Sequence, residues 1–148
     1  LPRTYKLVAS LMEHGCNRKL VHDTIYLSNL KELKLRNNLF NLAHFEQKDG
    51  YAWVKIPKDL FERYGVKKMS YVNTLGSIKG IEIWASFYYD KDMRKWKASL
   101  RSSRLPIDKL AKKYMGGGHP LAAGITLQKE LDINAIINDI KQYLKNHR

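Results

Sequence analysis

The sequence predicts an α+β fold, in which an N-terminal helical connector precedes a mixed β-sheet covered by helices. Three observations support this prediction. Leucines recur at helical spacing in the first part of the chain, aromatic and β-branched residues then follow with a period of two, and isoleucines at helical spacing close the chain. Because helices and strands come in blocks, the pattern favours α+β over a regular alternation. We expect the connector at residues 1–44 and the sheet domain at residues 45–148.

Three helices are expected in the connector. Thr4 can cap the first helix, which Gly15 ends, and Asn17 can cap the second. Asn29, followed three residues later by Glu32, matches a capping box for the third helix. The apolar residues of each helix fall on one stripe, which is typical of a helix that packs against a neighbouring surface.

The sheet domain opens with a hairpin signal. Lys48-Asp49-Gly50 separates a strand near 42–47 from a strand at 51–56. Pro57 ends the second strand and begins a short helix that stops at Gly65.

Two strands with clear alternation form the centre of the predicted sheet. Residues 81–89 and 95–102 alternate apolar and polar side chains, and a short helix at 73–78 comes before them. On the second of these strands the polar face carries Lys95, Lys97, Ser99 and Arg101. The chain then continues with a helix from Pro106, a strand at 123–127 and a terminal helix capped by Asp132.

Net charge is the strongest signal in the composition. Lysine and arginine outnumber aspartate and glutamate by 27 to 14, which gives a net charge of +13. Such a charge favours polyanions, above all nucleic acid or nucleotides, although a solvated lysine-rich surface has the same composition. The single cysteine, Cys16, excludes an internal disulfide framework and fits the cytoplasm. No apolar run is long enough for a membrane span, and a first residue of Leu predicts a piece of a longer polypeptide.

The densest cluster of special residues is Gly116-Gly117-Gly118-His119-Pro120-Leu121-Ala122-Ala123-Gly124. Three glycines together suit a loop that needs positive φ or that a ligand approaches closely, and backbone N–H groups in such a loop can cradle a phosphate. His119 adds a side chain that can donate a hydrogen bond or carry a charge near neutral pH. A glycine cap on the preceding helix is the alternative, but a single glycine suffices for a cap.

A second candidate site is Ser99-Leu100-Arg101-Ser102. Ser99 and Arg101 point to the same face of a strand, and a guanidinium beside a hydroxyl suits a phosphate oxygen. The strand lies about twenty residues before the glycines, so a strand–helix–loop return could bring Arg101 near His119. Taken alone, the motif also fits an edge strand with one solvated arginine.

Several catalytic signatures are missing from the sequence. It has no cluster of carboxylates and histidines for a divalent metal, no Walker loop and no Gly-x-Ser-x-Gly turn. The sequence therefore predicts a chain that holds a phosphorylated ligand and does not cleave it alone.

These two motifs resemble the DHH-associated domain of the DHH phosphoesterase superfamily, in its nano-RNase, phosphoadenosine-phosphate phosphatase and exopolyphosphatase-related branch. The similarity extends to Tyr71-Val72-Asn73 and to Ile78-Lys79-Gly80-Ile81-Glu82, and it covers nearly the whole chain. In that family an N-terminal DHH domain binds two manganese ions and performs catalysis. The Asp-His-His motif of that domain is absent here, so the resemblance implies the C-terminal, substrate-binding part and no metal ligands in this chain.

The resemblance also implies roles for individual residues. Gly116–Gly118 and His119 would face the substrate phosphate, where His119 would contact the transition state, and Arg101 would grip a phosphate with help from Ser99 or Ser102. Asn73 is a less distinctive match, which helix capping explains equally well. The implied partners are short RNA or a nucleotide and the DHH domain of the same polypeptide, without a membrane; a homodimer stays open.

Other functions fit the same motifs. Short oligoribonucleotides, phosphoadenosine phosphate and cyclic dinucleotides all remain candidate substrates, and a RecJ-like exonuclease is a further relative. A stand-alone module that binds single-stranded nucleic acid is the alternative without catalysis.

Overall fold

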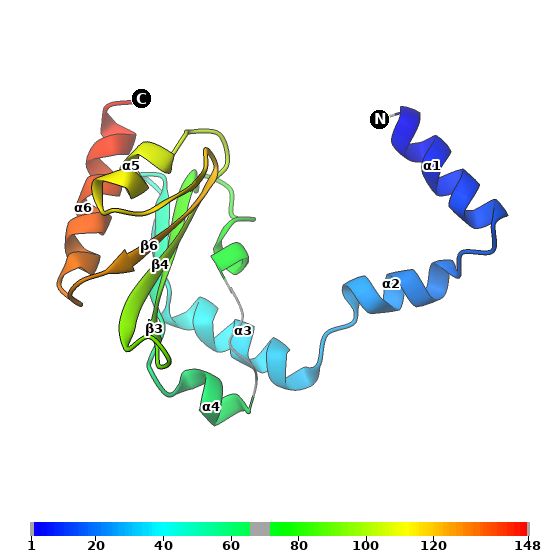
Figure 1. Cartoon of the computed structure of the whole chain (residues 1–148), viewed down its shortest axis with the longest axis horizontal. Coiled ribbons are helices and arrows are strands. Elements are labelled where there is room, and N and C mark those ends of the chain that lie inside the picture. Colours follow the sequence, from blue (N-terminus) through cyan, green and yellow to red (C-terminus); the bar gives the residue numbers. More distant parts are fainter. Residues whose placement is uncertain (1, 66–71, 148) are drawn as a thin grey trace. The chain divides into compact units, whose positions relative to one another are not determined.

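The computed structural model describes residues 2–65 and 72–147 (Figure 1). The chain divides into two compact units, a helical unit at Leu1–Leu30 and a sheet unit at Lys31–Arg148. The predicted connector extends to residue 44, but helix α3 (Leu30–Leu42) buries Leu35 and Leu39 in the core of the sheet unit. Helix α3 therefore packs as part of the sheet unit.

The helical unit consists of α1 (Pro2–Glu13) and α2 (Arg18–Tyr26). The predicted cap of the second helix is confirmed, because the side chain of Asn17 accepts a hydrogen bond of 3.0 Å from the backbone N–H of Leu20. The first helix begins at Pro2, ahead of the predicted cap Thr4, in keeping with the fixed φ of proline in a first turn. Neither helix contains a buried residue among those described.

The sheet unit is built on a mixed sheet. Its described strands have the order β1-β2-β3-β4-β6-β5. Their bounds are His44–Glu46, Tyr51–Lys55, Ile83–Asp90, Lys95–Ser102, Gly117–His119 and Ala122–Leu127 for β1 to β6. Strands β2 and β3 are parallel and all other neighbours are antiparallel. The hairpin predicted at residues 48–50 joins β1 and β2, with Gly50 at a φ of 80°.

Two helices cover one face of the sheet, as Figure 1 shows for the yellow and red segments. They are α5 (Asp108–Lys113) and α6 (Asp132–Lys145). Apolar residues of β3, β4 and β6 pack with the isoleucine stripe of α6 in one core, which includes Phe87, Leu100, Ile125, Ile136 and Ile140. The alternation that predicted an inward face on β4 is confirmed by this core.

The other face is covered only on part of its width. There α3 and α4 (Leu60–Tyr64) pack mainly over β2 and β3, while the 3₁₀ helix η1 (Val72–Leu75) contacts β3 and β4. Their core includes Val54, Leu60, Leu75 and Trp84. Side chains of β4, β5 and β6 do not take part in this core. The described residues thus leave one half of this face open.

Several boundaries differ from the sequence-based ones. The strand predicted at 81–89 starts at Ile83, the helix at 57–64 covers only Leu60–Tyr64, and the helix after Pro106 starts at Asp108. The predicted helix at 73–78 is the shorter η1. No helix in the described part of the chain combines the length and apolar character needed to cross a bilayer.

Candidate functional site

The glycine run forms a strand, where the sequence suggested a loop. Gly117–His119 is β5, at the edge of the sheet, paired antiparallel with β6. The N–H of Gly116 donates to the carbonyl of Ala111 at 2.9 Å and so satisfies the end of α5. Because N–H groups along a strand point alternately to its two edges, the run does not form a loop-type phosphate cradle. The expected loop is therefore a strand. The helix-cap alternative holds only in part, because Met115, with a φ of 55°, has the left-handed conformation after α5, while Gly116 contributes its N–H.

The three positions differ in whether the structure has room for a side chain. A Cβ on Gly116 would lie 2.4 Å from the carbonyl oxygen of Gly124, and a Cβ on Gly118 would lie 2.4 Å from that of Ala122. Gly118 also has a φ of 147°, which L side chains rarely adopt. A Cβ on Gly117 would meet nothing within 4 Å. Packing therefore requires two of the glycines and leaves the surface at Gly117 free for a ligand.

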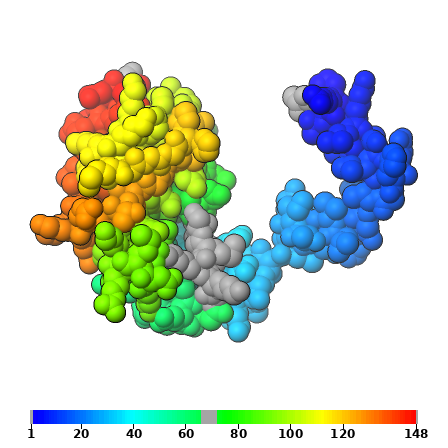
Figure 2. Space-filling view, viewed as in Figure 1, coloured from blue at the N-terminus to red at the C-terminus, as the bar shows by residue number. Residues whose placement is uncertain are grey.

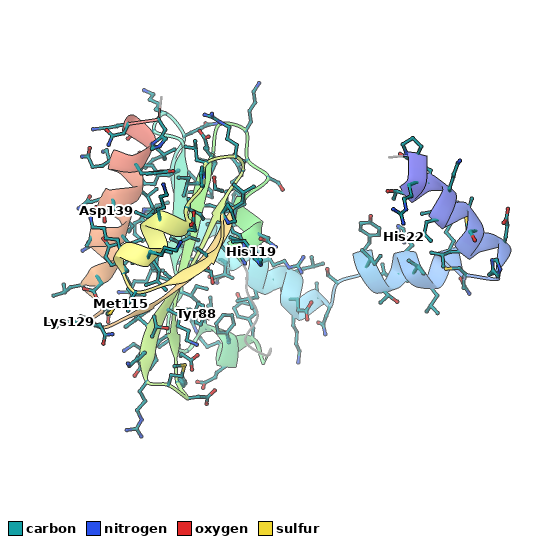
Figure 3. The ribbon with its side chains drawn as sticks, turned by 45° about the horizontal axis from the view of Figure 1, so that its top comes forward. His22, Tyr88, Met115, His119, Lys129 and Asp139 are labelled. Carbon is teal, nitrogen blue, oxygen red and sulfur yellow. The ribbon has the colours of Figure 1, made fainter. Side chains whose placement is uncertain are left out.

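The sheet register brings Arg101 and His119 to the same face. Ala122 on β6 pairs with His119 on one side and with Arg101 on the other. Partners in a ladder point to the same face, and strands lie about 4.8 Å apart, so the two backbones are about 10 Å apart. Trp84 on β3 extends this row beyond Arg101. The backbones of Arg101 and His119 are therefore close, as predicted. Figure 3 shows His119 on the side of the sheet away from α6.

A parallel row of small residues lies next to it. Gly117 pairs with Gly124, which pairs with Ser99, which pairs with Ser86. Ser99 therefore points to the same face as Arg101, as predicted. With two glycines in the row, a ligand on this face can approach the backbone itself.

Ser102 does not belong to this face. It lies one residue from Arg101, so its side chain turns to the opposite side of β4, where the residue is 6% exposed. Its hydroxyl is buried and makes no hydrogen bond with the described residues. The structure thus separates Ser102 from Ser99, and the assisting role suggested for it is corrected.

Arg101 is available to an anion. Its Nη1 donates to the carbonyl oxygen of Leu100 at 2.8 Å, and no carboxylate of the described residues lies within ion-pair distance. The nearby Arg104 instead forms an ion pair with Glu82, with Nε 2.6 Å from Oε1 and Nη2 3.1 Å from Oε2. A half-buried guanidinium with donors to spare is suited to a phosphate oxygen.

Asn73 lies on η1, which packs against β3 and β4. One residue after η1, a Cβ on Gly76 would lie 2.4 Å from Cζ2 of Trp84, the row neighbour of Arg101. The exposed Asn73 therefore comes from an element beside the row that carries Arg101 and His119. Tyr71, quoted with it in the motif, lies outside the described residues.

The site as the structure forms it includes residues to which the sequence assigned no role, although two of them lie in the motif at 116–124. These are Ala122, Gly124 and Trp84, which the pairing of strands places beside His119, Ser99 and Arg101. Their period-two spacing in the sequence was the available signal, but only the strand register shows which rows they join. Figure 2 shows α5, β5 and β6 in yellow and orange as one continuous part of the surface.

The residues present do not fit a manganese site. In the ranges 2–65 and 72–147, no three side chains of His, Cys, Asp or Glu come close enough together to bind one metal ion. No step of hydrolysis can therefore be assigned to this chain's own residues through a metal.

Known proteins resemble this chain in sequence or in fold. The chain is 35% identical over 144 residues to an uncharacterised Mycoplasma genitalium protein, MG371, covering 97% of this chain and 44% of that protein. It is 30% identical over 148 residues to the bifunctional oligoribonuclease and PAP phosphatase NrnA of Bacillus subtilis, covering 98% and 46%. The crystal structure of an exopolyphosphatase-related protein from Bacteroides fragilis superposes with a TM-score of 0.83 at 21% identity, covering 97% and 45%.

The chain thus spans a little under half the length of these relatives. The structural likeness confirms the α+β fold. Residues 66–146 match the model of the DHHA1 domain, which confirms the resemblance to the DHH-associated domain of DHH phosphoesterases. The chain belongs to the DHHA1 domain family.

Proposed function

We propose that this chain is the substrate-binding part of a metal-dependent phosphoesterase that hydrolyses short oligoribonucleotides or small nucleotides such as phosphoadenosine phosphate. The manganese ions and the nucleophile would come from a DHH domain of the same polypeptide. The family match and the activity for which the Bacillus subtilis relative is named support this proposal.

One observation carries the proposal. Arg101 and His119 project from one row of an open sheet face, beside a second row whose members at Gly117 and Gly124 have no side chain. A phosphate between the two side chains would receive charge-assisted hydrogen bonds from the guanidinium and a hydrogen bond from the imidazole. The adjoining glycines leave room for the rest of the nucleotide. This arrangement positions a substrate and stabilises phosphoryl charge, which are the two contributions that phosphoryl transfer needs from protein side chains.

Binding to the 148-residue chain tests this role directly. We expect phosphoadenosine phosphate and a diribonucleotide to shift the NMR signals of residues on β4, β5 and β6. Arg101→Ala should weaken binding by about 1–3 kcal/mol, since it removes a charged hydrogen bond to the ligand. His119→Ala should weaken binding by about 1 kcal/mol. Lys109→Ala, which removes an exposed charge from α5 on the other face, is the matched control and should leave binding unchanged.

Hydrolysis in the longer protein tests the reaction class. With Mn²⁺ present, the protein should hydrolyse diribonucleotides, and His119→Ala should lower kcat/KM. Tight binding of long single-stranded nucleic acid without any hydrolysis would favour the stand-alone module. Cleavage confined to cyclic dinucleotides or to single-stranded DNA would redirect the proposal to the corresponding relative.

A further inference from the structure

A cavity of about 380 Å³ lies between strand β2 and the first turn of α6, on the face of the sheet opposite the candidate phosphate site. It is lined by Trp53, Lys55, Glu130, Leu131, Ile133 and Asn134. Trp53 packs against the core that α6 completes, and Lys55, two residues later on β2, points to the same side of the sheet. The volume lies within the range of about 300–1,000 Å³ that is typical of small-molecule sites. The cavity is therefore a candidate binding site of its own.

The indole of Trp53 gives this cavity a flat wall. The imidazole of His44, its partner in the pairing of β1 with β2, stacks on the indole with ring centroids 4.1 Å apart and planes inclined by 11°. Phe87 on β3 meets the indole edge-on, with ring centroids 6.5 Å apart and planes inclined by 70°. These two rings hold the plane of the indole, whose remaining surface lines the cavity together with Leu131 and Ile133. A ligand with a planar aromatic ring suits such a wall.

Glu130 places a fixed carboxylate in the wall of the cavity. Its Oε2 accepts a hydrogen bond of 3.1 Å from Nε1 of Trp96, and its Oε1 accepts one from Nζ of Lys55. The hydrogen bond from Lys55 holds the pKa of Glu130 below its usual value, so the carboxylate is ionised at neutral pH. The Glu130 side chain is 46% exposed, and each of its oxygens can accept a second hydrogen bond. The carboxylate is thus oriented and still available to the donors of a ligand.

Lys55 brings a cation next to this carboxylate. Its Nζ forms the ion pair with Glu130 and lies 5.2 Å from the centroid of the Trp96 ring, so two contacts hold the ammonium in place. An ammonium has three N–H donors, and the bond to Glu130 leaves others for an acceptor in the cavity. Asn134, exposed on the first turn of α6, adds an amide that can donate or accept. The cavity therefore presents an acceptor and a donor side by side, next to a flat apolar wall.

These polar groups match the edge of guanine better than the edge of another base. Guanine presents the acceptor O6 next to two donors, the ring N1–H and the 2-amino group. A carboxylate can accept both donors at once, and an ammonium beside it can donate to O6. Adenine and cytosine each carry a single amino donor beside ring acceptors, so they offer the carboxylate one hydrogen bond in place of two.

We propose that this cavity binds the guanine base of a small nucleotide. The base lies against Trp53, its N1–H and 2-amino group donate to Glu130, and its O6 accepts from Lys55. Arg101 and His119 project from the other face of the sheet, so a nucleotide in this cavity is a ligand distinct from the one whose phosphate they would hold. The inference therefore goes beyond the proposed function and does not depend on it.

Nucleosides test the inference, because they lack the phosphate that the open face would bind. Guanosine, inosine and adenosine are titrated separately into the 148-residue chain, and NMR follows the indole N–H signals of Trp53 and Trp96 and the backbone amides of α6. Guanosine should shift these signals and bind about tenfold more tightly than inosine, which lacks only the 2-amino group and so loses one hydrogen bond to a charged acceptor. Adenosine should bind no more tightly than inosine.

Substitution of the carboxylate tests the assigned contact. Glu130→Gln keeps the shape of the side chain but replaces one acceptor oxygen by an NH₂ group, so it should weaken guanosine about tenfold and abolish the preference over inosine. Glu62→Gln is the matched control, because it also removes an exposed carboxylate paired with a lysine, on α4, and it should leave guanosine binding unchanged. Lys55→Met, which removes the donor to O6, should weaken guanosine about fivefold.

Three results would overturn the inference: equal affinity for the three nucleosides, an unchanged guanosine affinity in Glu130→Gln, or shifts confined to the open face around Arg101 and His119. Arg101→Ala should leave guanosine binding intact, which separates this cavity from the candidate phosphate site. Glutamine can still accept from Trp96, so Glu130→Gln should fold, and an unchanged thermal unfolding midpoint checks this. The comparison of nucleosides on the wild-type chain decides the question without any variant.

Discussion

The two faces of β4 differ in what they do for the molecule. On one face Trp96, Ala98 and Leu100 are buried in the core that α5 and α6 complete. On the other face, Ser99 and Arg101 remain partly exposed in the half of the sheet that the described helices leave open. Alternation along a single strand therefore assigns neighbouring residues to stability or to ligand binding. The comparison implies that substitutions at neighbouring positions should change different quantities. A substitution on the buried face should lower stability, and one on the open face should weaken ligand binding.

The largest expected effect is on the buried face. Leu100 is 0% exposed, so Leu100→Ala should lower the free energy of unfolding by about 2–5 kcal/mol through lost burial and a residual cavity. Arg101→Ala, the adjacent residue on the open face, should change it by no more than about 0.5 kcal/mol. Denaturant unfolding of both variants, with wild type at the same pH and salt, measures the difference.

The contrast between these two neighbours is the informative quantity. Comparable destabilisation by Leu100→Ala and Arg101→Ala would show that the guanidinium is part of the fold, and would remove the reason to regard it as a ligand for substrate. A stable Arg101→Ala variant that binds nucleotide normally would show that Arg101 on the open face does not bind the substrate.

The glycines of β5 offer the same comparison within three residues. Gly118→Ala should lower stability by about 1–3 kcal/mol, because its Cβ would meet the backbone carbonyl of Ala122 and its φ of 147° disfavours a side chain. Gly117→Ala should keep the fold, because the space around it is empty, and should instead weaken nucleotide binding if the ligand lies against the backbone there. Thermal unfolding and an NMR titration of the two variants measure these effects.

Equal loss of stability in both variants would mean that the strand needs flexibility at every glycine and that the open space has no bearing on ligands. Normal binding by a folded Gly117→Ala variant would move the ligand away from β5, even if Arg101 still contributes. Gly117→Val places a larger side chain at the same position. If side-chain size at this position hinders the ligand, Gly117→Val should weaken nucleotide binding more than Gly117→Ala does.

Much of the fold could be predicted because its signals are local. The alternation of apolar and polar residues on β4 assigned its two faces, and the isoleucine stripe of α6 predicted its buried side. Both patterns report only which side of an element is buried. The face shared by Ser99 and Arg101 followed from the same rule, and their approach to His119 needed only a short return of the chain.

What escaped prediction depends on contacts distant in sequence. Gly117–His119 has low strand propensity, and it is a strand because β6 offers an edge to pair with. Helix α3 looked like part of the connector until the packing of Leu35 and Leu39 in the sheet unit's core was known. Ser102 was named from its motif, although one residue of alternation takes it to the buried face. The difference among the three glycines depends on neighbouring carbonyls, which no local pattern encodes.

The smallest expected effect is on the covered face, where the stability that Asp139 contributes should depend on pH. Burial alone would raise the pKa of Asp139 on α6, but hydrogen bonds from Lys113 at 2.7 Å and Tyr114 at 2.5 Å outweigh burial and hold the pKa below its usual value. The carboxylate therefore contributes stability above about pH 4, and this contribution is lost as the pH falls through the lower folded-state pKa. Asp139→Asn should cost about 1 kcal/mol at pH 7, and its deficit should shrink as the pH falls well below 4.

This pH dependence tests whether Asp139 joins α5 to α6 through hydrogen bonds or through charge alone. A carboxylate that only neutralised nearby lysines would lose its effect in high salt, whereas one that accepts two hydrogen bonds should keep most of its effect there. Urea unfolding of wild type and Asp139→Asn at pH 7 and pH 2.5, each at low and high salt, separates these cases. Asp92→Asn, at an exposed turn residue between β3 and β4, is the control and should show no deficit at either pH. A deficit that stays constant with pH would mean that Asp139 acts through packing, and that its ionised form adds nothing to the face opposite the candidate site.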